Sequence, residues 1–258
     1  MGSRCFPAFP KARPVLPEAF KSLYERYYIA NREGQTTATT GAKALEAWMH
    51  RKVSEDLVRG PLSRGTARTL EIGAGTLNHV RHEGPPVGGA YDIVEPFRAL
   101  FEGSELMSRV RDQYDDVGAI AGEVKYDRII SIATFEHLLD LPRVIAIAAR
   151  HLDEGATMRV AIPSEGSIAW RLGWTLTTGL EFRLKYGLDY GVLMRHEHVN
   201  SWREIRRALE HFFVDVKASA FGLSAGLSFY QFYECRSPSL TRCEALLDEW
   251  TAHDAAAR

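Results

Sequence analysis

Short apolar runs and helical stripes alternate along the middle of the chain. Apolar runs typical of buried strands occupy residues 69–72, 90–94, 126–134 and 157–162, and a more polar run at 110–114 fits a weaker third strand. Helical patterns separate them, as at residues 97–107 and 141–152. This order predicts an α/β fold whose parallel sheet carries helices on both faces.

The pattern differs at the two ends of the chain. Before the first strand, apolar residues at helical spacing predict two helices, over residues 18–31 and 42–58, and the proline-rich residues 1–17 predict a loosely ordered arm. After the fifth strand, an aromatic-rich stretch within residues 166–198 is too long for a plain connection and predicts an inserted lid or acceptor-binding element. Ser201 and Glu204 form a capping box for a helix through His211. Two strands (213–218 and 227–235) and a short helix within 237–258 complete the chain.

These patterns divide the chain into two parts. Residues 1–60 form an N-terminal arm with cap helices, and residues 61–258 form the sheet domain with its lid.

A glycine turn follows the first strand. Glu71 precedes Gly73 and Gly75, whose lack of a Cβ permits a tight turn and close backbone approach to a ligand. Such a turn presents helix-start amides with partial positive charge. Asn78 stands where a dinucleotide fingerprint requires a third glycine, and a carboxylate at Glu71 would repel a pyrophosphate. A cationic amino-acid head, in contrast, would be attracted to it.

A second carboxylate ends the second strand. Glu95 follows Glu71 by 24 residues, close to the roughly 20 expected for an acidic residue that binds ribose hydroxyls. Such a carboxylate can accept two hydrogen bonds from a diol. An exposed glutamate that starts the next segment is the alternative.

The fourth strand carries the most specific motif, Y-D-x-I-x-S followed by F-E-H-L at residues 126–138. Together with the two carboxylates and the glycine turn, this order resembles the class I S-adenosylmethionine-dependent methyltransferases of the small-molecule type. The resemblance covers residues 69–235 and departs from the family at Leu77, where the usual loop has another glycine.

The resemblance implies a Rossmann-like sheet of about seven strands, mostly parallel with an antiparallel last strand. It also implies S-adenosyl-L-methionine as cofactor. Glu71 would then lie near the amino-acid head, Ala133 and Thr134 would line the methionine portion, and Asp115 or Asp116 would bind the adenine amino group, with a solvated turn as the alternative. The full implied cofactor set is Glu71, Gly73, Ala74, Gly75, Asn78, Glu95, Pro96, Asp115, Asp116, Ala133 and Thr134.

Three histidines are candidates for a catalytic base. They are His137, His196 and His198, and a histidine side chain ordinarily titrates near neutral pH, as a base for a hydroxyl acceptor should. Glu136 and His137 could instead cap and orient the helix that follows. The His-x-His pair suggests a metal at first sight, but no nearby cysteine or well-spaced carboxylate completes a shell, so no metal is predicted.

Composition narrows the partners. The 32 basic and 33 acidic residues nearly cancel, so no nucleic-acid partner is expected. Three scattered cysteines argue against a disulfide framework and suit a reducing cytoplasm. The aromatic stretch at 166–193 suggests transient contact with a membrane or a lipid-linked substrate, or packing on the N-terminal helices.

We therefore expect a methyltransferase (EC 2.1.1.-) that acts in the cytoplasm in biosynthesis, on a small-molecule or carrier-linked acceptor such as a sugar or natural-product hydroxyl or amine. Two alternatives remain open. One is a non-catalytic, methyltransferase-like binding protein, and the other is a nicotinamide-dependent oxidoreductase, for which a Tyr-x-x-x-Lys pair is missing after the fourth strand.

Overall fold

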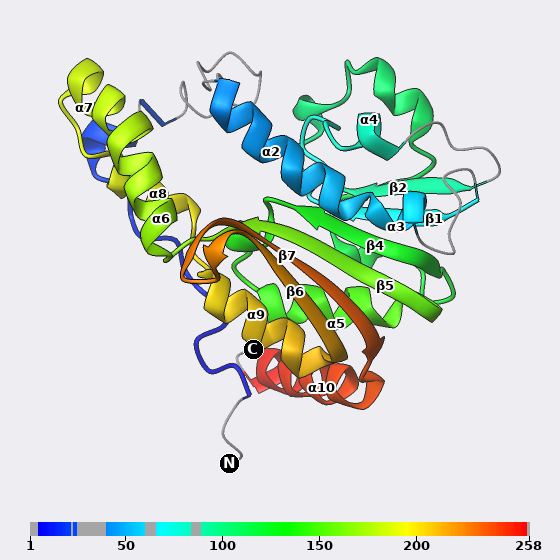
Figure 1. Ribbon diagram of the computed structural model, residues 1–258. Helices are drawn as coiled ribbons and strands as arrows, with labels where there is room; N and C mark the ends of the chain where they lie inside the picture. The colour runs from blue at the N-terminus through cyan, green and yellow to red at the C-terminus, as the bar shows by residue number, and fades with distance from the viewer. Residues whose placement is uncertain (1–4, 22, 25–39, 60–65, 84–88, 257–258) are drawn as a thin grey trace.

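A seven-stranded sheet forms the centre of the computed structural model, which describes residues 5–21, 23–24, 40–59, 66–83 and 89–256 (Figure 1). The strand order is β3-β2-β1-β4-β5-β7-β6; β7 runs antiparallel to both β5 and β6, and the other paired strands are parallel. The predicted Rossmann-like sheet with an antiparallel last strand is thereby confirmed. The strands are β1 (Arg68–Ile72), β2 (Ala90–Val94), β3 (Gln113–Tyr114), β4 (Tyr126–Ile132), β5 (Leu152–Pro163), β6 (Phe213–Ser224) and β7 (Leu227–Pro238).

Helices cover both faces of this sheet, as the alternating pattern predicts (Figure 1). One face carries α2 (Thr40–Val53), α3 (Glu55–Arg59) and α4 (Val80–Glu83), and the other carries α5 (Leu141–Arg150), α9 (Trp202–Phe212) and α10 (Leu240–Ala256). Side chains of successive strand residues point to opposite faces of the sheet, so they pack in the two cores on either side of it. Ile129 packs in the core beside α5, and Ile130 packs in the core beside α2.

The capping box that the sequence predicts at the start of α9 is present. The Ser201 side chain accepts from the Glu204 amide, and the Glu204 carboxylate accepts from the Ser201 amide at 2.9 Å.

Several predicted elements differ from the observed ones. The helix expected at 97–107 is instead two 3₁₀ turns, η1 (Arg98–Leu100) and η2 (Glu105–Arg109), because the Ser104 side chain caps a new turn by accepting from the Leu106 amide. A further 3₁₀ turn, η3 (Val117–Ala119), follows β3, which has only two residues. The helix expected at 42–58 breaks at Ser54, whose hydroxyl donates to the His50 carbonyl at 3.1 Å.

The prediction of a loosely ordered N-terminal arm is wrong for residues 5–17. Phe6 stacks on Phe212 of α9 with ring centroids 5.8 Å apart, and Phe9 is buried in the same core. The Lys11 amide donates to the Leu139 carbonyl at 2.8 Å. The arm thus packs along the sheet domain because its phenylalanines complete the core. Residues 25–31 of the first expected helix lie outside the described part of the chain.

The stretch after β5 is helical. It comprises α6 (Ile168–Trp174), a π-helical turn η5 (Thr175–Gly179), α7 (Leu180–Tyr186) and α8 (Tyr190–Glu197), which stand together beside the sheet (Figure 1). We call residues 166–198 the lid. Its Phe182 and Leu193 form a small core with Leu16 of the arm and with Phe20 just after it, so these aromatic and apolar residues pack inward. None of the helices in the described part of the chain is both long and apolar enough to cross a membrane.

Candidate active site

The glycine turn lies where β1 ends and is shaped by two glycines in the left-handed region. Gly73 has φ +77° and Gly75 has φ +53°, a backbone conformation that side chains disfavour. A Cβ on Gly73 would lie 2.2 Å from Thr134 Oγ1, whereas a Cβ on Gly75 would meet no atom within 4 Å. Gly73 therefore lets β1 and the end of β4 approach, while Gly75 faces open space.

Leu77 adopts the same left-handed conformation, with φ +63°. This is the position where the sequence departs from the usual glycine. Its side chain is fully buried in the core beside α2. The loop therefore keeps the backbone geometry of a glycine while its leucine packs inward, at a conformational cost of roughly 1–2 kcal/mol.

Glu95 connects the end of β2 to the glycine turn. Its carboxylate accepts from the Gly75 amide at 2.9 Å and from the Phe97 amide at 3.0 Å. The side chain is only 5% exposed, and Pro96 beside it is exposed. The two predicted cofactor motifs thus meet in one place, at the carboxyl ends of neighbouring parallel strands, where ligands bind in open α/β sheets.

Glu71 is closed inside the protein. It is 2% exposed and accepts a hydrogen bond from the Tyr91 hydroxyl at 2.7 Å. Burial raises the pKa of Glu71 to about 8, against the lowering effect of the Tyr91 hydrogen bond. Glu71 is therefore mainly protonated at neutral pH. Its role beside a cationic head group stays a prediction.

The remaining predicted cofactor residues surround the turn unevenly. Thr134 Oγ1 lies 3.3 Å from the Gly73 carbonyl, and Ala133, with φ +50°, follows directly after β4. Ala74 is buried and Asn78 is exposed. The Asp116 side chain caps η3 by accepting from the Gly118 amide at 2.7 Å, and exposed Asp115 accepts from Gln113 Nε2 at 2.8 Å. Both aspartates have partners within the protein, and their adenine role stays a prediction.

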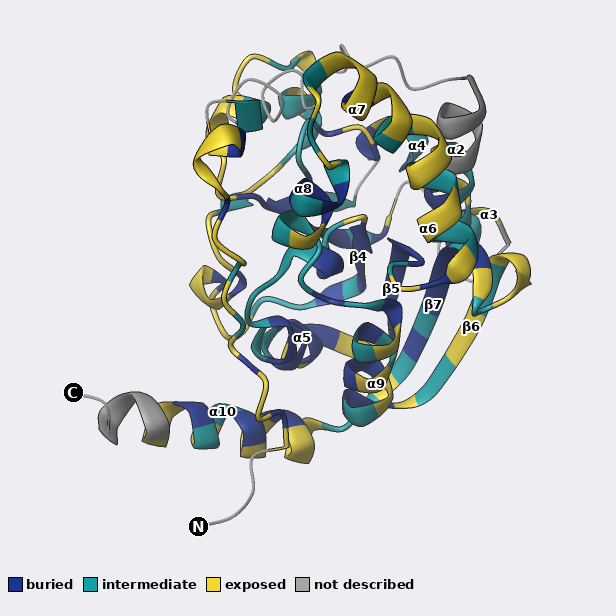
Figure 2. Ribbon diagram, turned by 90° about the vertical axis from the view of Figure 1, so that its left-hand side faces the viewer, coloured by how far each residue is buried: buried dark blue, intermediate teal, exposed yellow. Residues whose placement is uncertain are grey.

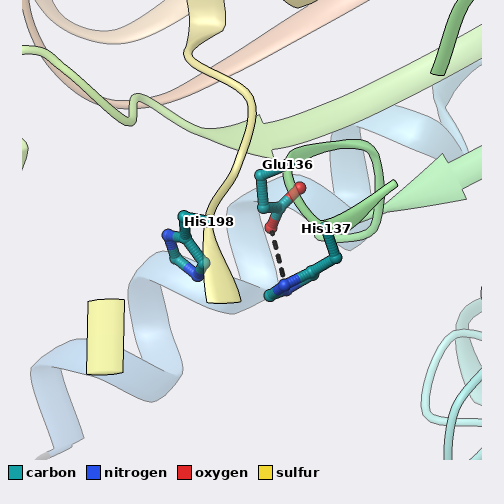
Figure 3. A group of neighbouring side chains, drawn as sticks. All are labelled: Glu136, His137 and His198. Carbon is teal, nitrogen blue, oxygen red and sulfur yellow. Dashed lines mark ion pairs between the residues drawn. The ribbon is translucent and has the colours of Figure 1, made fainter. Parts of the chain in front are cut away.

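Three side chains meet just beyond Thr134 (Figure 3). Glu136 and His137 lie in the 3₁₀ turn η4 (Phe135–His137), and His198 directly follows α8. One possible ligand atom from each lies within 4.8 Å of the other two. We call Glu136, His137 and His198 the triad. Two backbone hydrogen bonds hold these segments together, from the Val199 and Asn200 amides to the Glu136 carbonyl.

Burial and neighbouring charges shift the pKa values of Glu136 and His198 in the triad. Burial raises the pKa of Glu136 to about 7, partly offset by nearby His198. The pKa of His198 is also raised: burial opposes its charging, but the hydrogen bond to Glu165 and the nearby Glu136 outweigh it. Its Nδ1 lies 2.8 Å from Glu165 Oε2, an oxygen that also accepts from Trp170 Nε1 of the lid at 2.7 Å. Perturbed groups of this kind gather at functional sites.

His196 lies apart from the triad. Its Nδ1 is 2.7 Å from the Pro14 carbonyl, and its ring packs edge-on against Tyr24. The structure thus brings two of the three predicted histidines together and directs the third toward the N-terminal arm.

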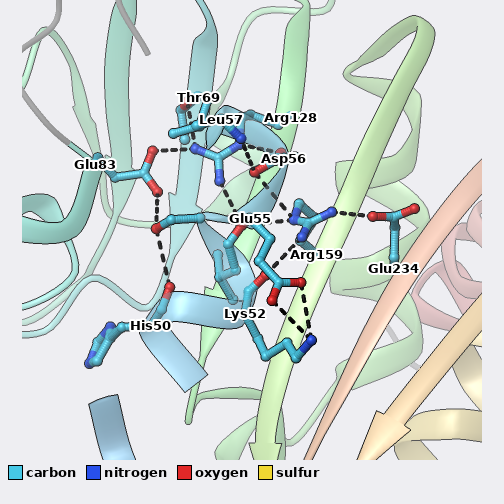
Figure 4. A network of polar contacts seen from close by, with 12 residues as sticks. His50, Lys52, Glu55, Asp56, Leu57, Thr69, Glu83, Arg128, Arg159 and Glu234 are labelled. Carbon is cyan, nitrogen blue, oxygen red and sulfur yellow. Dashed lines mark hydrogen bonds and ion pairs between the residues drawn. The ribbon is translucent and has the colours of Figure 1, made fainter. Parts of the chain in front are cut away.

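A buried ion-pair network behind the site was missed by sequence reasoning (Figure 4). Arg128 of β4 is fully buried, contacts Glu83, and donates to Asp56 of α3 at 2.9 Å. Arg159 of β5 donates to the Val53 carbonyl at 2.8 Å and contacts Glu234. The network fastens α2 and α3 to the sheet. An arginine inside each of two apolar strands was the signal in the sequence.

Fold and site together define a class I methyltransferase, the class whose methyl donor is S-adenosylmethionine. A family model described as a methyltransferase domain matches residues 45–213, more than half of the chain, and the chain therefore belongs to this family. No curated protein matches the chain by sequence.

Solved structures share the fold at low identity. The CurJ carbon methyltransferase gives a TM-score of 0.56 at 18% identity; the match covers 86% of this chain but only 62% of that one. NodS, an N-methyltransferase from Bradyrhizobium japonicum WM9 in complex with S-adenosyl-L-homocysteine, gives 0.53 at 12% identity over 86% and 100% of the two chains. The plantazolicin methyltransferase BpumL gives 0.54 at 10% identity over 85% and 94%.

Proposed function

We propose that this protein transfers a methyl group from S-adenosylmethionine to a hydroxyl or amine of a small-molecule or carrier-linked acceptor, such as a sugar or a natural product. The observation that carries this proposal is the bond between Glu95 and the Gly75 amide. It unites the two cofactor motifs in a single site beside Thr134.

The residues at this site fit the cofactor. The open space at Gly75 leaves the turn approachable, and the Glu95 carboxylate lies beside it as a ribose acceptor. When bound, S-adenosylmethionine supplies a methyl group on a positively charged sulfur. Gly73, Ala74, Gly75 and Asn78 would hold it from the turn, with Glu95 and Pro96 at its ribose.

The chain's main contribution would be to hold donor and acceptor in line, an effect worth up to roughly 7–11 kcal/mol in favourable cases. Glu136 and His137 follow Thr134 by two and three residues, and His198 lies beside them in space. The triad therefore supports an acceptor position next to Thr134. For a hydroxyl acceptor, an imidazole of the triad would take the proton as the oxygen is methylated. Glu165 would orient His198 for this role.

The exposed apolar residues of the lid favour contact with an apolar acceptor or with a lipid surface. Ile168, Leu172, Leu176, Leu180 and Leu184 recur at every fourth residue and are all exposed. Figure 2 shows exposed residues along α6 and α7. The same helices also expose three basic side chains, Arg171, Arg183 and Lys185, and one acidic side chain, Glu181. We propose that this stripe contacts an anionic lipid surface, from which a lipid-linked acceptor would reach the site.

Calorimetric titration of the purified chain with S-adenosylmethionine, S-adenosylhomocysteine and NADH tests the donor. We expect the first two to bind at micromolar concentration and Glu95→Ala to lose at least tenfold in affinity. Glu102→Ala, an exposed glutamate after η1, serves as the matched control and should bind normally. Binding of NADH alone would overturn the proposal, and binding without transfer to any hydroxyl or amine acceptor would favour a non-catalytic role.

A further inference from the structure

We propose that Glu136, His137 and His198 bind a divalent transition-metal ion. Their side chains come from η4 and from the segment after α8, which lie about sixty residues apart in the chain, and one ligand atom from each lies within 4.8 Å of the others (Figure 3). An ion of the zinc class binds nitrogen and oxygen ligands at about 2.0–2.2 Å and would draw these atoms closer together.

A buried oxygen of Glu136 supports the site independently. The residue is 1% exposed, and among the described residues its Oε2 has no hydrogen-bond partner. A buried polar atom without a partner destabilises a fold unless something else satisfies it. The other oxygen, Oε1, faces His137 Nε2 at 3.8 Å. A bound cation would satisfy this carboxylate.

The two histidines are held in the way that metal-binding histidines usually are. His198 Nδ1 lies 2.8 Å from a Glu165 carboxylate oxygen, and His137 Nδ1 lies 2.9 Å from the Glu197 carbonyl. A proton on each Nδ1 would be donated to these oxygens, which fixes the tautomer in which Nε2 carries the lone pair. Such outer partners orient imidazole ligands and raise their basicity. Glu165 is thus a positioning residue for His198.

The donor set indicates the class of ion. Two imidazoles with one carboxylate suit zinc, manganese, iron or cobalt better than magnesium or calcium, which prefer oxygen ligands alone. Three protein ligands leave at least one position open, as in catalytic zinc sites. This part of the inference rests on the proposed function: at the open position the ion would hold the acceptor hydroxyl and lower its pKa. In the metal-bound state the hydroxyl would lose its proton to solvent, and the two imidazoles would act as ligands instead of as the base.

Sequence reasoning predicted no metal because it considered His196 and His198 as the pair. The fold replaces His196 with Glu136 and His137, which only the packing of η4 against residues 197–200 brings into range.

Metal binding to the full chain, stripped with a chelator and dialysed, tests the site directly. Cobalt(II) is the probe, followed by its visible absorption, and zinc and manganese are measured by elemental analysis after dialysis. We expect about one equivalent of ion per chain. His198→Asn and Glu136→Gln should each lower the affinity at least tenfold, and Glu165→Gln should lower it about 10–100-fold, as outer-partner changes do.

His196→Asn is the matched control, two residues from His198 but turned toward Pro14, and should bind like the unchanged chain. His82→Asn controls for the separate stacked histidines His50, His79 and His82. Circular dichroism of each variant shows whether it folds, and Glu165→Gln keeps the test usable if Glu136→Gln does not fold.

Lack of cobalt binding by the unchanged chain, or equal loss in His196→Asn, would overturn the metal site. Titration of the metal-free chain with S-adenosylhomocysteine separates the two proposals. Binding of S-adenosylhomocysteine without metal binding would refute only the metal site, whereas metal binding without S-adenosylhomocysteine binding would refute only the proposed function.

Discussion

Thr134 stands against Gly73 so closely that the glycine cannot carry a side chain. A Cβ on Gly73 would lie 2.2 Å from Thr134 Oγ1 and 2.7 Å from its Cβ. The contact joins the end of β4 to the turn after β1, which are paired neighbours in the sheet. The absence of a side chain at Gly73 therefore lets the carboxyl ends of β1 and β4 approach each other closely.

Substituting alanine at each glycine of the turn should have unequal effects. Gly75→Ala adds only left-handed strain, about 1 kcal/mol, because nothing lies near its new Cβ. Gly73→Ala adds the same strain and a clash with Thr134, so it should cost about 2–4 kcal/mol. Urea unfolding of the two variants measures the difference. Equal losses would mean that the contact between Gly73 and Thr134 does not exist in solution.

At Leu77 we expect the usual order of stability of alanine and glycine variants to be reversed. Both Leu77→Ala and Leu77→Gly lose a fully buried side chain, at a cost of about 2–5 kcal/mol. Glycine, however, relieves the strain of φ +63°. The glycine variant should therefore be about 1 kcal/mol more stable than the alanine variant. Thermal unfolding compares them, and a more stable alanine variant would show that residue 77 is not left-handed.

The sheet could be predicted from the sequence because its strands are apolar and are separated by turns and helical segments at regular intervals. The glycine turn, Glu95 and the F-E-H-L motif are local signals, and each is found at the end of a strand as expected. The helix at 97–107 was wrong because the Ser104 cap outweighed the apolar spacing.

Long-range pairings could not be predicted in the same way. Glu136 and His198 are 62 residues apart, and no local pattern shows that they meet. The burial of Phe6 and Phe9 likewise depends on Phe212, far along the chain. Arg128 and Arg159 were visible as charges within strands, but their partners on α3, α4 and β7 follow only from the packing.

Glu71 should make the protein less stable as the pH rises through 8. Its pKa is about 8 in the folded protein and 4.5 when exposed, so the folded state binds the proton more tightly. That contribution is complete below pH 4.5 and is lost as the pH rises through 8. Between pH 7 and 8, the unfolding free energy should fall by about 1 kcal/mol from this group alone.

The isosteric variant Glu71→Gln isolates this effect, because it carries no proton to lose. Its unfolding free energy relative to the unchanged protein should increase by about 1 kcal/mol from pH 7 to 8. Burial also raises the pKa of Glu136, to about 7, and lowers that of His79, to about 4, but both groups are present in both proteins and cancel. Chemical unfolding of both proteins at pH 7 and pH 8 measures this difference in unfolding free energy. Parallel curves would show that Glu71 is ionised at neutral pH.

Arg128 should matter far more than an arginine on the surface. Arg128→Met would remove the nearest cation from buried Asp56 and Glu83, leaving Asp56 only Arg159 at 3.5 Å, and should cost about 3–5 kcal/mol. Arg68, which pairs with Asp127 and Asp153 while 40% exposed, is the matched control, and Arg68→Met should cost less than about 1 kcal/mol. Adding Asp56→Asn and Glu83→Gln to Arg128→Met should restore part of the loss. Equal losses of unfolding free energy in the two variants would contradict a buried ion-pair network around Arg128.

The lid stripe predicts binding to lipid vesicles. Leu176 and Leu184 are among its most exposed members, so Leu176→Ser with Leu184→Ser should weaken binding to vesicles containing anionic lipid by about tenfold or more. Val214→Ser with Leu223→Ser removes two aliphatic side chains of β6 that are at least as exposed and should leave binding unchanged. Sedimentation with vesicles measures both, and added salt should weaken binding because Arg171, Arg183 and Lys185 flank the stripe. Equal weakening in both variants, or no binding by the unchanged protein, would contradict a lipid-facing lid.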